Sequence, residues 1–166
     1  MFTRILVPTD FSEPSEAALE YAKGLAARFG ASLRLVHVVE DPIVTGAFGA
    51  ETYVPEPIGF SAALRADAEQ RLATLLPPAE RERLRATTEV LSGPSASTIV
   101  NAARELGVDL IVMGTHGRTG VVHALMGSVT ERVVRSAPCP VLTVHAPLPA
   151  AVVEPLPVST TAFVVV

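Results

Sequence analysis

Short, almost continuously apolar runs alternate with longer amphipathic segments along this chain. The apolar runs are rich in β-branched residues, and they cover residues 5–7, 33–39, 110–113 and 141–144. Runs of this length and character are typical of parallel strands that are covered on both faces. A weaker and more alternating run at 87–91 predicts an edge strand. The pattern therefore predicts five strands.

Helical spacing of apolar residues fills the segments between these runs. The predicted helices cover residues 15–29, 62–76, 94–106 and 129–135. The first has Ser12 as its N-cap and ends at Gly30. Because strands and helices alternate, we expect an α/β fold, a single doubly wound five-stranded parallel sheet with helices on both faces.

Two segments do not follow this alternation. Residues 41–60 form a long connection with several prolines and glycines, and loops of this length are usually functional lids or disordered. Residues 146–166 form a proline-rich tail that becomes apolar again at 163–166. We therefore predict one domain over residues 1–145 and a tail over 146–166. The end of the tail either adds a strand to the sheet of a partner or frays.

Composition and charge exclude several classes of partner. The 166 residues carry a net charge of −4 without a run of like charges, which argues against binding to nucleic acid or to an anionic membrane. No apolar stretch approaches the roughly 20 residues of a membrane span. The single cysteine, Cys139, cannot form an internal disulfide. A nucleophilic thiol would need a base beside it, and the sequence gives no sign of one. A cytoplasmic location is expected.

The segment after the fourth predicted strand is rich in glycine. Gly114 and Gly117 leave the strand, and Gly127 precedes Ser128 at the start of the last predicted helix. Glycine lets backbone amides approach an anion, and a helix N-terminus adds free N–H groups, so phosphate is the expected ligand. A P-loop is excluded because the only lysine is Lys23. A dinucleotide fingerprint would follow the first strand instead of the fourth.

Four motifs together resemble the universal stress protein family. They are GxxGx9GS, read from Gly114 to Ser128, LVPTD at residues 6–10, DLIVMG at 109–114 and APCPV at 137–141. The resemblance extends from about residue 2 to residue 144. It implies a sheet order of 3-2-1-4-5, in which the first and fourth strands are neighbours.

The resemblance also implies membership of the branch of the family that binds ATP. Contacts to the phosphates and ribose, and the helix start beside them, fall on Gly114, Gly117, Gly127, Ser128, Val129 and Thr130. The adenine is expected to lie against Pro8, Thr9, Val38 and Met113. Asp10 is expected to face the ribose or a Mg²⁺ ion held through water. Arg118 and His116 are the cationic loop residues that could contact phosphate.

Structural alternatives remain open for several of these residues. The glycines are also ordinary turn residues, and Asp10 also fits a turn or N-cap carboxylate. Ser128 with Glu131 matches a capping box, which would occupy the serine hydroxyl. His37, inside a predicted strand, is expected to be a hydrogen-bonded core residue.

The leading functional prediction is a cytoplasmic ATP-binding protein that acts as a nucleotide-responsive stress or signalling module. No triad or metal-ligand spacing is found, so no catalytic residue is predicted. A slow ATPase or self-phosphorylating enzyme is one alternative, and a nucleotide-free dimeric interaction protein is the other. By resemblance, a homodimer is expected through the edge strand at 141–144, together with a protein signalling partner of unknown identity.

Overall fold

The computed structural model describes residues 2–40, 44–45, 51–52, 60–116, 126–145 and 163–165. Its main sheet contains β1 (Arg4–Pro8), β2 (Ser32–Val39), β5 (Thr87–Ser92), β6 (Leu110–Gly114), β7 (Val141–Val144) and β8 (Phe163–Val165). The helices are α1 (Glu13–Phe29), α2 (Phe60–Leu75), α3 (Pro78–Arg83), α4 (Ser95–Glu105) and α5 (Ser128–Ser136). A separate antiparallel pair is formed by β3 (Val44–Thr45) and β4 (Glu51–Thr52).

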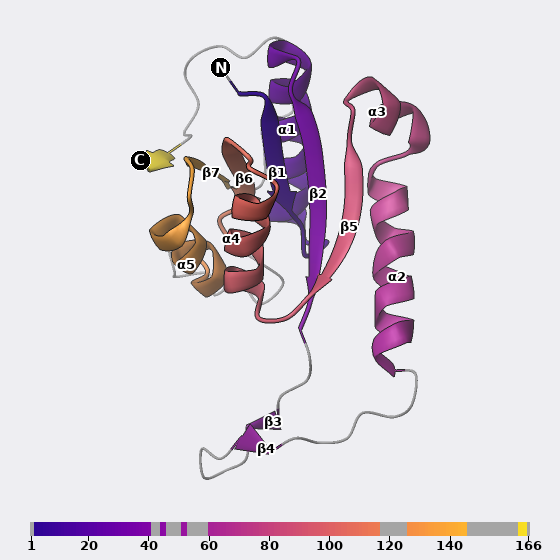
Figure 1. Ribbon diagram of the computed structural model, residues 1–166, viewed down its shortest axis with the longest axis vertical. Helices are drawn as coiled ribbons and strands as arrows, with labels where there is room; N and C mark the ends of the chain where they lie inside the picture. The colour runs from indigo at the N-terminus through magenta and orange to yellow at the C-terminus, as the bar shows by residue number, and fades with distance from the viewer. Residues whose placement is uncertain are drawn as a thin grey trace.

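The strand order of the main sheet is β5-β2-β1-β6-β7-β8 (Figure 1). The first five strands in this order are parallel, which confirms both the predicted five-stranded sheet and the order 3-2-1-4-5. β8 is an addition, because it pairs antiparallel with β7 inside the same chain. The outer edge of β7, where a homodimer was expected, is therefore occupied by the chain's own C-terminal strand.

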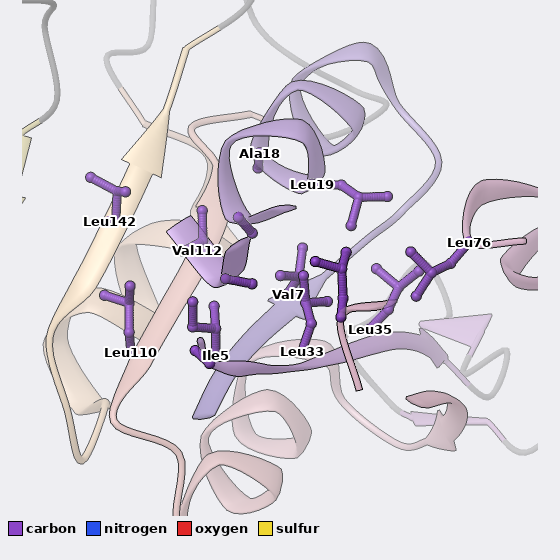
Figure 2. Packing of buried hydrophobic residues seen from close by; sticks show 14 of the residues in the cluster. Ile5, Val7, Ala18, Leu19, Leu33, Leu35, Leu76, Leu110, Val112 and Leu142 are labelled. Atoms are coloured by element: carbon purple, nitrogen blue, oxygen red, sulfur yellow. The ribbon is translucent and has the colours of Figure 1, made fainter. Parts of the chain in front are cut away.

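Two apolar cores lie on opposite faces of the sheet. Ile5 and Val7 of β1 pack with α1 and α2 in one core, together with Leu33 and Leu35 (Figure 2). Leu6, between them in sequence, belongs to the other core, beneath α4 and α5. Successive side chains of a strand point to opposite faces, so a strand that is covered on both faces must be apolar at every position. This explains the unbroken apolar runs in the sequence.

The ends of α1 follow the predicted signals. Ser12 is the N-cap, and Gly30 ends the helix with a φ of 65°, a left-handed conformation that favours glycine. α3 was not predicted, because Pro77 and Pro78 were interpreted only as the end of α2. In the structure Pro78 is its first residue, a position at which the missing N–H of proline costs nothing.

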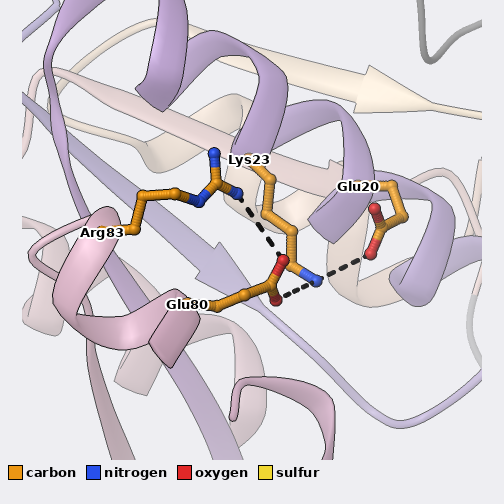
Figure 3. A network of polar contacts seen from close by, with 4 residues as sticks. All are labelled: Glu20, Lys23, Glu80 and Arg83. Atoms are coloured by element: carbon orange, nitrogen blue, oxygen red, sulfur yellow. Dashed lines mark hydrogen bonds and ion pairs between the residues drawn. The ribbon is translucent and has the colours of Figure 1, made fainter. Parts of the chain in front are cut away.

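An ion-pair network joins α1 to α3 (Figure 3). The Nζ of Lys23 lies 2.8 Å from Oε1 of Glu20 and 2.8 Å from Oε2 of Glu80, and Arg83 also contacts Glu80. Burial by itself lowers the pKa of the Lys23 amine, because it disfavours the charged form. The hydrogen bonds to both carboxylates have the larger combined effect, so the pKa is raised. The only lysine of the chain therefore has a structural role away from the glycine-rich segment.

Candidate functional site

A cavity of about 580 Å³ opens at the carboxyl ends of β1, β2 and β6. β1 and β6 are neighbours in the sheet, but the helices that follow them cover opposite faces. A crevice forms at such a point in a doubly wound sheet, and it is the usual ligand site of this architecture. The N-termini of α4 and α5 complete the wall.

The cavity collects the residues that were predicted to bind a nucleotide. Its walls include Pro8, Thr9, Asp10, Val38, Met113, Gly114, Gly127, Ser128, Val129 and Thr130. Gly117 and Arg118 lie outside the described residues. The fold therefore brings together segments that are far apart in the sequence, while the contacts of each residue to a ligand remain predictions.

The backbone fixes the start of α5 beside the end of β6. The N–H of Gly127 donates to the carbonyl oxygen of Thr115 at 2.7 Å. The N–H of Thr115 donates to the carbonyl oxygen of Val144 at 2.9 Å. The first helical bond of α5 runs from the N–H of Glu131 to the carbonyl of Gly127. The N–H groups of the three residues between these two, 128–130, consequently have no acceptor within the helix.

The alternative in which Ser128 forms a capping box with Glu131 is wrong. Gly127 occupies the N-cap position, with φ of −71° and ψ of 154°, and Ser128 is the first helical residue. Glu131 does not reach back to the cap, because its Oε1 accepts hydrogen bonds from Nη2 and Nε of Arg135 at 2.8 and 3.2 Å. Among the described residues the Ser128 hydroxyl has no hydrogen-bond partner. It is therefore not occupied by capping, and Ser128 lies on the cavity wall.

The N-terminus of α4, on the same cavity, is already neutralised by the chain itself. The N–H of Ser95 donates to Oε1 of Glu40 at 2.9 Å. Hydrogen bonds from the side chain and backbone of Ser95 lower the pKa of Glu40, so this carboxylate keeps its charge at neutral pH. In α4 the first N–H is therefore bonded to a carboxylate. The N-terminus of α5 also lies at the cavity, and its positive end has no carboxylate among the described residues bonded to its first N–H.

Gly114 is required for the packing of β6 against α1. A Cβ at this position would lie 2.8 Å from the carbonyl carbon of Pro14, in the first turn of α1. The carbonyl of Gly114 accepts a buried hydrogen bond of 2.9 Å from Oγ1 of Thr130. The hydroxyl of Thr130 therefore holds α5 against β6.

Asp10 has the turn contacts that were one of its two expected roles. Its Oδ1 accepts hydrogen bonds from the N–H and the hydroxyl of Ser12, at 3.2 and 2.5 Å, as a turn carboxylate does. The residue also lies on the cavity wall. The next residue, Phe11, has a φ of 63°, and such strained backbone is found most often near functional sites.

His37 is hydrogen-bonded, as predicted, but it also lies on the cavity wall. Its Nδ1 is 2.7 Å from the carbonyl oxygen of Thr9. A carbonyl only accepts, so Nδ1 carries the proton. The ring of His37 also packs against that of Phe11, with centroids 4.5 Å apart. The carbonyl of Thr9 and the ring of Phe11 thus fix the orientation of this histidine.

Several wall residues were not predicted as site residues. They are Ser15, Val36, His37, Glu40, Ser95, Ile99, Met126 and Glu131. Glu40 carries a recognisable signal, because it directly follows β2, as Asp10 comes two residues after β1, and the carboxyl ends of parallel strands meet at one edge of the sheet. His116, which was considered for phosphate contact, lines the cavity as well, and its Nδ1 lies 3.1 Å from Oγ1 of Thr115.

A metal-binding cluster and an activated thiol are absent from the described part of the chain. It contains no group of three or more His, Cys, Asp or Glu residues arranged to hold a metal ion. Cys139 is half-buried, and burial raises the pKa of its thiol, which is the opposite of activation. None of the described helices is both long and apolar enough to span a membrane.

Comparison with known proteins identifies the family of this fold and cavity. Residues 1–145 match the model of the universal stress protein family. The chain belongs to this family. Universal stress protein MJ0531 of Methanocaldococcus jannaschii is 36% identical over 149 residues, which are 89% of this chain and 84% of that protein. The predicted family is therefore confirmed.

Solved structures of universal stress proteins share the fold. The structure of MJ0577, from the same organism as MJ0531, has a TM-score of 0.72 at 28% identity and covers 90% of this chain and 99% of that one. A universal stress protein solved in complex with cAMP has a TM-score of 0.60 at 21% identity, and covers 87% of this chain and 97% of that one. At this lower identity the likeness shows a common fold.

Proposed function

We propose that this universal stress protein binds ATP in the cavity between β1 and β6 and acts as a nucleotide-responsive stress or signalling module in the cytoplasm. The observation that carries the proposal is the start of α5, where the N–H groups of residues 128–130 have no helical acceptor at the cavity wall. Unpaired N–H groups at the positive end of a helix form a site for phosphate.

The rest of the cavity supports an adenine nucleotide. Its volume of about 580 Å³ lies within the range of small-molecule sites. Val38, Ile99 and Met113 give it an apolar wall against which a flat base can pack. The fold is shared with a protein that was solved with cAMP, which is also an adenine nucleotide. ATP thus accounts for both the apolar wall and the helix N-terminus.

Asp10 is the residue that we propose to face Mg²⁺. Its Oδ1 is already an acceptor for Ser12, and Mg²⁺ usually keeps several waters when it is bound with phosphates. A contact through water to a Mg²⁺ on the ATP phosphates therefore fits this carboxylate better than a cage made by the protein. Magnesium would offset the repulsion between the phosphates and Asp10.

Binding without rapid turnover is the form of the function that we favour. A hydrolase needs a free base beside the attacking water. At this cavity Glu40 is hydrogen-bonded to Ser95, Glu131 is paired with Arg135, and Asp10 accepts from Ser12. These carboxylates are held in structural bonds, so we expect phosphate release from bound ATP to be slow.

Asp10→Asn tests this proposal, since asparagine keeps an oxygen for Ser12 and removes the charge. We expect the wild-type protein to bind ATP more tightly with Mg²⁺ than without it, and the variant to lose most of this difference while it still binds ATP. Calorimetric titration measures both affinities, and phosphate release is assayed in parallel. Rapid release by the wild-type protein that the variant abolishes would indicate an enzyme instead. Absence of ATP binding in the folded wild-type protein would refute the proposal.

A further inference from the structure

The turn that carries Asp10 contains a residue in an unfavourable backbone conformation. Phe11 has a φ of 63°, in the left-handed region that a bulky residue rarely adopts. Such a conformation persists only where the surrounding contacts hold it. Phe11 lies between Asp10 and Ser12, whose N–H and hydroxyl both donate to Oδ1 of Asp10. The backbone of Phe11 is therefore part of the hydrogen-bonded turn that orients the Asp10 carboxylate.

Contacts from three parts of the chain hold Phe11 in this conformation. Its N–H donates to Oγ1 of Thr9 at 3.0 Å. Its ring packs against that of His37 in β2, with centroids 4.5 Å apart. The guanidinium carbon of Arg71, Cζ, lies over the same ring, 3.9 Å from its centroid. A guanidinium in this position is attracted to the face of the aromatic ring.

Arg71 reaches this turn from outside the cavity. It belongs to α2, which packs against β2 and β5 (Figure 1), and it is not among the residues of the cavity wall. Its side chain is 43% exposed, and Nη1 lies 3.9 Å from Oδ2 of Asp67. Exposed ion pairs contribute little to stability, so the stacking on Phe11 is the more specific contact of this side chain.

We infer that Arg71 is a positioning residue for the ATP site, which by stacking on Phe11 holds the Asp10 turn in the conformation that presents the carboxylate to Mg²⁺. This inference rests on the proposed function, in which Asp10 contacts Mg²⁺ through water. Because Arg71 lies outside the cavity wall, its effect on the affinity for ATP passes through Asp10 and depends on Mg²⁺. The effect cannot exceed that of the contact itself, about 2- to 5-fold for a partly exposed cation–π pair.

Three single variants separate the stacking of Arg71 from its charge. Arg71→Met removes the guanidinium and keeps a residue of similar helix propensity. Arg71→Lys keeps a cation over the ring and should retain most of the wild-type behaviour. Arg65→Met is the matched control, because it removes the same charge and a similar ion pair, that of Arg65 with Glu69, from the same helix.

Hydrogen exchange of the Ser12 amide tests the inference in the protein without nucleotide. This N–H lies 3.2 Å from Oδ1 of Asp10 and 3.1 Å from Oγ of Ser15, so its protection reports how firmly the turn is held. We expect exchange to be about 2- to 5-fold faster in Arg71→Met than in the wild-type protein and Arg65→Met. Equal rates in Arg71→Met and the wild-type protein would overturn the inference, whether or not the protein binds ATP.

A double-mutant cycle with Asp10→Asn tests whether Arg71 acts through Asp10. The affinity for ATP is measured by calorimetric titration with and without Mg²⁺. We expect Arg71→Met to weaken binding about 2- to 5-fold with Mg²⁺ and to leave it unchanged without Mg²⁺. In a chain that already carries Asp10→Asn, the same change should have no further effect.

The outcomes separate a failure of this inference from a failure of the proposed function. An equal loss of affinity with and without Mg²⁺, or the same loss in the Asp10→Asn chain, would overturn the role of Arg71 and leave ATP binding standing. No loss of affinity in Arg71→Met would do the same. Absence of ATP binding by the folded wild-type protein would refute the proposed function, and with it this role of Arg71.

Discussion

Replacing Ser128 by proline is expected to weaken ATP binding by about 10- to 100-fold and to leave the fold intact. The N–H that proline removes has no acceptor in α5, since the first helical bond runs from Glu131 to Gly127. Hydrogen bonds to charged groups contribute about 1.5–3 kcal/mol, which corresponds to this loss of affinity. The affinity is measured by calorimetric titration with ATP and Mg²⁺.

The local geometry allows this proline without strain. Ser128 is the first residue of α5, the helical position at which proline is most favoured. Gly127 has a φ of −71° and a ψ of 154°, within the extended region that a residue before proline adopts. Ser128→Ala is the control, because it removes the hydroxyl and keeps the N–H. Equal affinities for Ser128→Pro and the wild-type protein would show that this amide does not bind the ligand.

Gly114→Ala is expected to lower the free energy of unfolding by about 1–3 kcal/mol, the usual cost of overpacking. The new Cβ would lie 2.8 Å from backbone of Pro14, and backbone cannot rotate away as a flexible side chain can. This steric clash can be relieved only if the first turn of α1 moves away from the end of β6. Urea unfolding of the two proteins measures the difference.

Gly24→Ala provides a matched control for this prediction. Gly24 lies inside α1, and a Cβ there would have no heavy atom within 4 Å. Alanine is favoured over glycine inside a helix by roughly 0.5–1 kcal/mol, so this variant should gain stability. If Gly114→Ala were as stable as the wild-type protein, the contact between β6 and α1 would not be as close as the structure shows.

Much of the fold could be predicted because the sheet is covered on both faces. Residues such as Ile5, Leu6 and Val7 each enter one of the two cores, which leaves an apolar run that is visible in the sequence. Such runs do not determine the order of the strands in the sheet, and this order was predicted only from the family resemblance. The same limitation explains β8, because an apolar segment at 163–166 does not reveal which strand edge it joins.

The candidate site was predictable where its residues belong to a spaced motif. The described motif residues from Gly114 to Thr130 reach the cavity with Asp10, although a long stretch of chain separates them from it. Glu40 belongs to no motif, and its partner Ser95 starts a helix on another crossover, so the bond between them could not be foreseen. The packing role of Gly114 depends on where α1 places Pro14, which only the tertiary structure shows.

Backbone amide resonances of the nitrogen-15-labelled protein, recorded while ATP and Mg²⁺ are added, test directly whether phosphate binds at the N-terminus of α5. We expect saturable binding in which the amides of Ser128, Val129 and Thr130 shift most. The Ser95 amide, which is held by Glu40, should keep its hydrogen bond and shift less. Saturation that leaves residues 128–130 unmoved, or a complete absence of binding to the folded protein, would contradict a phosphate site at the N-terminus of α5.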